Sequence, residues 1–124
     1  MNIEKILKEN VLINLNIDVN ERDRWDKDNS LASDTFTVVI PLSSMDENTS
    51  VNEIDKAFFV GNNEITINKN EIKLKVFTCE TNFSNSIKDI HEEVENHVRY
   101  VSKILESFRI KDFKLICDFY IWVD

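Results

Sequence analysis

Glycine and proline are nearly absent from this sequence, which has one residue of each in a chain of 124. Average proteins contain about 7% glycine and about 5% proline. Phosphate-binding loops and dinucleotide fingerprints need several glycines at fixed offsets, so that backbone amides can approach phosphate oxygens. Gly61 alone cannot build such a loop, and turns must be made largely by Asn and Asp. The composition therefore argues against the common nucleotide-binding motifs.

Cysteine and long apolar runs are also scarce. The two cysteines, Cys79 and Cys117, are too few for a disulfide framework and fall in predicted strands, so we expect buried, reduced thiols. No segment approaches the roughly 20 consecutive apolar residues of a membrane span. Residues 1–5 are not followed by the apolar run of a signal peptide. We therefore expect a cytoplasmic protein that makes no contact with a membrane.

The residues that are present are typical of one packed domain covering residues 1–124. Hydrophobic residues make up 42% of the chain and charged residues 31%, whereas a disordered chain would contain fewer Ile, Leu, Val and Phe. A chain of this length has room for one hydrophobic core.

Helices are predicted where apolar residues recur at steps of three and four. The strongest covers residues 85–108, and a short one covers 3–9. Ser50 and Glu53 have the spacing of a capping box, which predicts a further short helix over 51–58.

Strands are predicted where apolar residues alternate with polar ones, over 11–19, 35–42, 64–68, 71–79 and 113–123. We expect the first two to pair antiparallel, and 64–79 to form a hairpin. The last strand is apolar on both faces and should lie in the middle of the sheet or under a second layer. The predicted fold is α+β: an antiparallel or mixed sheet of about five strands packed against one long helix in the C-terminal half, with a short N-terminal helix.

Negative charge is concentrated in one third of the chain. The formal net charge is −8, and residues 18–64 account for −7 of it, with 11 acidic and 4 basic side chains. Such a field repels nucleic acid, whose binding depends on neutralised phosphates, and speeds association with a basic protein surface. We therefore expect a basic protein partner and no direct binding of nucleic acid. A solvated acidic loop without a partner is the simpler alternative.

Trp25 lies within the acidic stretch 21–28. Tryptophan is among the residues most enriched at binding hot spots, because it buries a large area at a small entropic cost. The alternative is that Trp25 folds back over the core together with Leu31. The residues predicted to contact the partner are Asp23, Trp25, Asp26, Asp28, Asp46 and Glu47.

Metal sites are not supported by spacing, and we expect no metal and no cofactor. A calcium loop beginning at Asp26 would need Gly and Glu where Leu31 and Thr37 stand. His91 and His97 lack the zincin spacing, and on a helix they point about 120° apart. His97 is expected to be a partly buried structural histidine.

Catalytic motifs are also not recognisable, and we expect no enzymatic activity. Thiols within apolar strands have raised pKa values and are inert. Asp118, inside the apolar strand 113–123, is expected on an exposed sheet face beside Lys114, or beside Lys73 or Lys75 across the sheet; a buried, paired carboxylate is the alternative.

Three functional hypotheses remain. The first is an acidic inhibitor that masks a basic surface of a nucleic-acid-directed enzyme or toxin. In size and charge alone, the chain resembles bacterial immunity proteins and phage proteins that block host defence. The second is a small-ligand-binding domain with Asp118, Tyr120 and Trp122 on one strand face. The third is a homo-oligomeric structural or assembly subunit that associates through strand 113–123 or helix 85–108.

Overall fold

The structure, a computed structural model, describes residues 2–18, 30–58, 63–84 and 90–122, and it has an α+β fold. Within these ranges, three helices, a 3₁₀ turn and five strands follow one another. Their bounds are α1 (Ile3–Glu9), β1 (Val11–Asp18), β2 (Ser30–Pro41), η2 (Leu42–Ser44), α2 (Val51–Ala57), β3 (Glu64–Ile67), β4 (Glu71–Ser84), α3 (Ile90–Ser107) and β5 (Lys114–Trp122).

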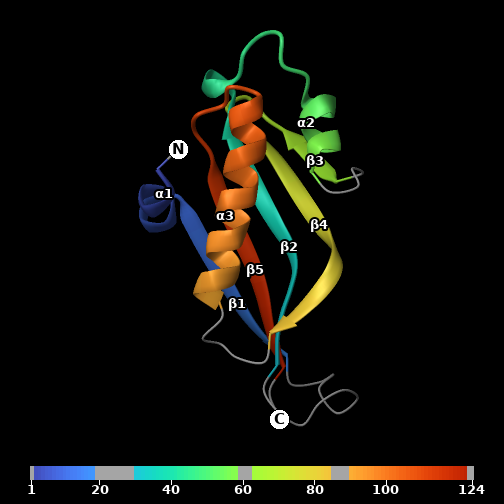
Figure 1. Cartoon of the computed structure of the whole chain (residues 1–124). Coiled ribbons are helices and arrows are strands. Elements are labelled where there is room, and N and C mark those ends of the chain that lie inside the picture. Colours follow the sequence, from blue (N-terminus) through green and yellow to red (C-terminus); the bar gives the residue numbers. More distant parts are fainter. Residues whose placement is uncertain (1, 19–29, 59–62, 85–89, 123–124) are drawn as a thin grey trace.

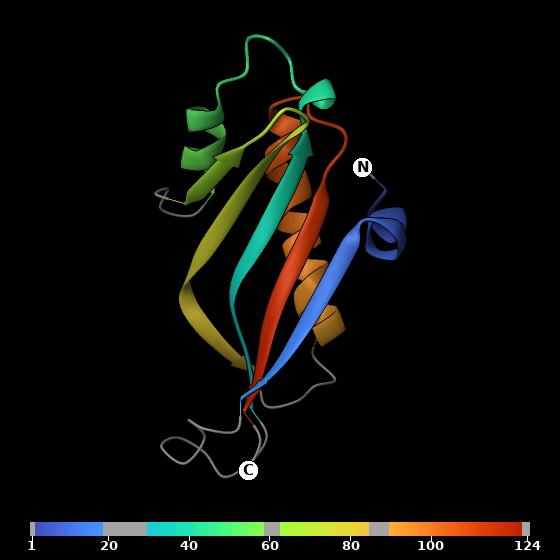
Figure 2. The ribbon, with the colours of Figure 1, turned by 180° about the vertical axis from the view of Figure 1, so that it is seen from behind.

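The five strands form one mixed sheet in the order β1-β5-β2-β4-β3. β1 and β5 run parallel, and every other neighbouring pair is antiparallel. The long helix α3 crosses one face of this sheet (Figure 1). The opposite face is seen in Figure 2, and none of the described helices lies over it. The sheet therefore has a face covered by α3 and an open face.

The predicted mixed sheet and long helix are confirmed, and one predicted pairing is wrong. β1 does not pair with β2, because β5 lies between them. The doubly apolar strand β5 is an interior strand, with β1 on one side and β2 on the other, whereas β2 holds the middle position.

Asparagine side chains shape the local structure in a chain nearly without glycine. Asn2 caps α1, its side-chain oxygen accepting a hydrogen bond from the Lys5 amide at 3.2 Å. In the β3–β4 hairpin, Asn68 Oδ1 accepts from the amides of Asn70 and Glu71 at 2.8 and 2.9 Å. The capping box is not formed as predicted: α2 begins after Ser50, whose side chain makes no capping hydrogen bond.

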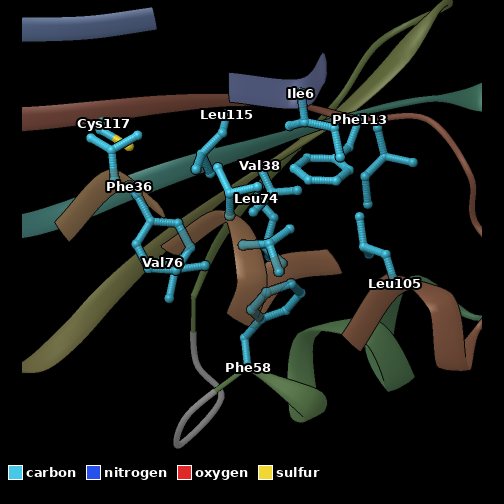
Figure 3. Close-up of a cluster of buried hydrophobic side chains, with 14 of the residues drawn as sticks. Ile6, Phe36, Val38, Phe58, Leu74, Val76, Leu105, Phe113, Leu115 and Cys117 are labelled. Atoms are coloured by element: carbon cyan, nitrogen blue, oxygen red, sulfur yellow. The ribbon is translucent and has the colours of Figure 1, made fainter. Parts of the chain in front are cut away.

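The core lies between α3 and the covered face of the sheet (Figure 3). β2, β4 and β5 direct alternate side chains toward the helix because successive residues of a strand face opposite sides. The helix contributes the stripe predicted from its spacing. Fully or almost fully buried residues from these elements include Phe36, Val38, Leu74, Val76, Leu115, Cys117, Val94, Val98, Val101 and Leu105.

Candidate functional site

The predicted partner-binding residues fall into two groups. Asp23, Trp25, Asp26 and Asp28 lie outside the described residues. Asp46 and Glu47 follow η2, and both are exposed. Asp46 also shapes its turn, because its carboxylate accepts a hydrogen bond from the Asn48 amide at 3.3 Å and its carbonyl accepts from the Thr49 amide at 3.0 Å.

These two groups are attached at opposite ends of the sheet. Residues 19–29 connect the end of β1 to the start of β2, whereas Asp46 and Glu47 follow the other end of β2 (Figure 1). A strand of 12 residues is about 40 Å long at a rise of about 3.3 Å per residue. The six residues stay a prediction, and the two groups can be tested separately.

Cys117, a candidate nucleophile, is completely buried in β5. Burial, and secondarily the charge of Asp118, raises the pKa of its thiol from 9.0 to about 12. The thiol is therefore protonated at neutral pH, and reagents in solvent cannot reach it. The expectation of a buried, reduced thiol is confirmed for this cysteine.

His97, a candidate base or ligand, is a packed structural histidine. Its ring stacks on Phe36, with ring centroids 4.7 Å apart and an interplanar angle of 30°. Burial lowers the pKa of the imidazole below 6.5, and Nε2 lies 3.9 Å from a carboxylate oxygen of Glu93. His91 is exposed. In the described ranges, no three His, Cys, Asp or Glu residues are grouped closely enough to hold a metal ion.

Asp118 lies half-buried on the open face of the sheet. Its carboxylate accepts a hydrogen bond from the Asn14 side chain at 3.0 Å, because β1 and β5 pair these two residues directly. The open-face expectation is confirmed, but the expected neighbours Lys73 and Lys75 are on β4, which β2 separates from β5.

A shallow hollow of about 420 Å³ lies on the open face of the sheet. Val39 is nearly buried at its floor, and Lys73 and Lys114 flank Val39 on the two neighbouring strands. Leu12 also lines this hollow and is 55% exposed. The hollow therefore combines apolar surface with two exposed lysines and two glutamates, Glu9 and Glu71, and the carboxylate of Glu71 lies 3.8 Å from the Lys73 ammonium.

A second groove of about 510 Å³ runs beside β1 on the helix-covered side. It is lined from α1, β1 and the first turns of α3, by Leu7, Val11, Ile13, His91, Glu92, Val94 and Glu95. Its apolar floor and acidic rim were missed by sequence reasoning, which considered the acids of α3 only as metal ligands. The alternation of β1 and the acids at the start of α3 are visible in the sequence, but their proximity is not.

Comparisons with known proteins give no relative: no family model matches the chain, and neither a curated protein nor a solved structure matches it. Among the described helices, none is long and apolar enough to cross a membrane.

Proposed function

We propose that the protein is an acidic protein-binding module that acts by occlusion. It covers a basic surface of its partner, in the manner of an inhibitor or immunity-type protein that blocks a nucleic-acid-directed enzyme or toxin in the cytoplasm. The observation that carries this proposal is the net charge of −8, of which −7 belongs to residues 18–64. A field of this sign favours encounter with basic surfaces that themselves bind phosphates.

The chemistry of the described residues supports binding without turnover. Cys117 holds its proton, and the His97 ring is engaged in packing against Phe36. Both side chains are packed in the core, whereas a catalytic nucleophile or base must be able to reach the substrate. The module therefore acts through steric and electrostatic masking.

The experiment is capture of partners from a lysate of the source cell at low and high salt. The wild-type chain is compared with Trp25→Ala and with a triple variant that replaces Asp23, Asp26 and Asp28 by Lys. We expect a basic protein that binds at low salt, is released at high salt, and is lost in both variants. Failure of the wild type to capture any basic protein overturns the proposal.

A separate variant tests the second acidic group, Asp46 and Glu47, which also belongs to the residues predicted to contact the partner. Replacing Asp46 and Glu47 by Lys alters the charge at the other end of β2, and both side chains are exposed, so the fold should tolerate the change. Loss of capture in this variant alone would place the contact at η2 and would exclude residues 23–28 as the binding surface.

Binding of a small ligand is the second candidate function, favoured by the open-face hollow. Lys73 and Lys114 flank Val39 there, and the hollow is large enough for a small metabolite. Thermal-shift measurements against a panel of nucleotides and carboxylates test this function. A rise in Tm that disappears in Lys73→Ala would support it, and a flat result would remove it.

A further inference from the structure

β1 is a long edge strand, which α1 flanks where the strand begins (Figure 2). It pairs with β5 on one side, and none of the described residues pairs with the other side. Natural edge strands are commonly short, or carry Lys, Pro or a bulge that prevents pairing with another chain. β1 has eight residues and contains neither Lys nor Pro, whereas the opposite edge strand, β3, has only four residues.

The direction of the β1 backbone identifies the groups that are available. The carbonyl of Asn10 accepts a hydrogen bond from the Leu115 amide at 2.8 Å and so points toward β5. Because successive residues alternate in direction, the backbone groups of Leu12 and Asn14 also face β5. The N–H and C=O groups of Val11 and Ile13 therefore point toward the free edge.

The surfaces on both sides of this edge suit the side chains of an added strand. On the helix side, Val11 and Ile13 are half-buried and form the floor of the 510 Å³ groove, with Leu7 and Val94 in its walls. On the open side, Leu12 is 55% exposed. A strand added to β1 would place alternate side chains in the groove and beside Leu12, covering apolar surface on both faces.

The rim of the groove favours a basic occupant. Glu92 is exposed, and the Glu95 carboxylate forms an ion pair with the Arg99 guanidinium at 3.1 Å. A Lys or Arg on the added strand can reach Glu92 from the groove side. A second copy of this chain, paired antiparallel through β1, would instead bring two identical acidic rims to the same side of the joint sheet, with −8 on each copy.

We propose that the free edge of β1 binds an extended segment of the partner as a sixth strand, with apolar and basic side chains of that segment entering the groove between β1 and α3. This inference rests on the proposed function for the class of partner, a basic protein. It adds the mode of recognition: backbone hydrogen bonds at Val11 and Ile13, and a charge contact at Glu92.

The test uses a synthetic peptide of about eight residues, in which Ile and Lys alternate with Thr so that one face is apolar and basic. Amide hydrogen exchange is followed by NMR on the full chain. At about ten times its Kd, the peptide should slow exchange about tenfold at Val11 and Ile13, whereas Leu12 and Asn14, already bonded to β5, should change little. A peptide N-methylated at the amides that face β1 is the matched control and should not bind.

Two pairs of variants separate backbone pairing from charge. Ile13→Pro removes a donor at the free edge, and Ile13→Val keeps that donor; only the first should weaken peptide binding, by about tenfold. Glu92→Lys should weaken it by about tenfold as well, whereas Glu53→Lys on α2 makes the same charge change away from the groove and should have a much smaller effect. Because Glu92 is exposed, its variant remains informative if Ile13→Pro does not fold.

The outcomes distinguish this inference from the proposed function. Peptide binding without protection of Val11 and Ile13, or no peptide binding, overturns the edge-strand inference. If the chain captures a basic protein that Ile13→Pro and Glu92→Lys leave unaffected, the proposed function stands and the edge is not its site. If light scattering shows a dimer that Ile13→Pro dissociates, the edge is occupied by a second copy and the inference is wrong.

Discussion

The reactivity of Cys117 provides a quantitative test of the described core. The thiol is buried among apolar side chains in β5, and burial followed by the charge of Asp118 raises its pKa from 9.0 to about 12. This rise in pKa lowers the thiolate fraction at pH 8 about 1,000-fold relative to an unperturbed thiol. Because only the thiolate is nucleophilic, alkylation through the folded state should be slowed by at least that factor.

The assay is modification by a chromogenic disulfide reagent at pH 8 in a Cys79→Ser background, so that Cys117 is the remaining thiol. The native protein should react at least about 1,000-fold more slowly than a model thiol, and urea should raise the rate as the population of unfolded chain grows. Circular dichroism confirms that the background variant is folded. Native reaction within about tenfold of the model thiol would refute the placement of Cys117 and the inert role derived from it.

Three further predictions concern stability. The lowered pKa of His97 means that the unfolded chain binds a proton more readily than the folded chain, so this residue should make the unfolding free energy fall as the pH drops below 6.5, by at most about 1.4 kcal/mol per pH unit. In urea titrations the fall should be shallower for His97→Gln than for the wild type, and equal slopes would contradict the burial of this imidazole. Ser102 Oγ is buried and has no hydrogen-bond partner among the described residues, so Ser102→Ala should raise the unfolding free energy by up to about 1 kcal/mol, and a clear loss would contradict that environment. Phe58 is fully buried and meets the Tyr100 ring edge-on at 5.9 Å; Phe58→Ala should lower the unfolding free energy by about 3–5 kcal/mol in chemical denaturation, and a cost below about 1 kcal/mol would contradict its place in the core.

Those parts of the fold that depend on local spacing could be predicted from the sequence. The apolar stripe of α3 is visible because Val94, Val98 and Val101 recur at helical steps. The interior place of β5, between two other strands, agrees with apolar residues on both of its faces. The turn at Asn68 was also predictable, because a chain with one glycine must use other residues there.

Pairing between distant strands could not be predicted in the same way. In the parallel pairing of β1 with β5, Val11 lies opposite Leu115. The spacing of apolar residues in each strand does not indicate which strand it pairs with. β2 and β4 are also longer than predicted, and their additional residues include the pair Leu31 and Ser84. This extension could not be predicted, because these residues show no alternation of apolar and polar side chains.

The candidate site was predicted from charge alone, and charge indicates the sign of a surface but not which residues lie together on it. The sequence indicates an acidic surface, but Asp46 and Glu47 follow one end of β2 while residues 19–29 precede the other. The groove beside β1 combines Leu7, Ile13 and Glu92, which are contributed by three elements. Such a site depends on the packing of α1 and α3 beside the edge strand, and no local sequence motif predicts that packing.

Recognition of a basic surface is measured by the Kd of the wild-type chain for its captured partner over a series of NaCl concentrations. We expect a basic partner whose affinity falls steadily as salt rises, with a shallower dependence once Asp23, Asp26 and Asp28 are replaced by Lys. An affinity that does not change with salt, or a captured partner that is itself acidic, would contradict recognition of a basic surface by this protein.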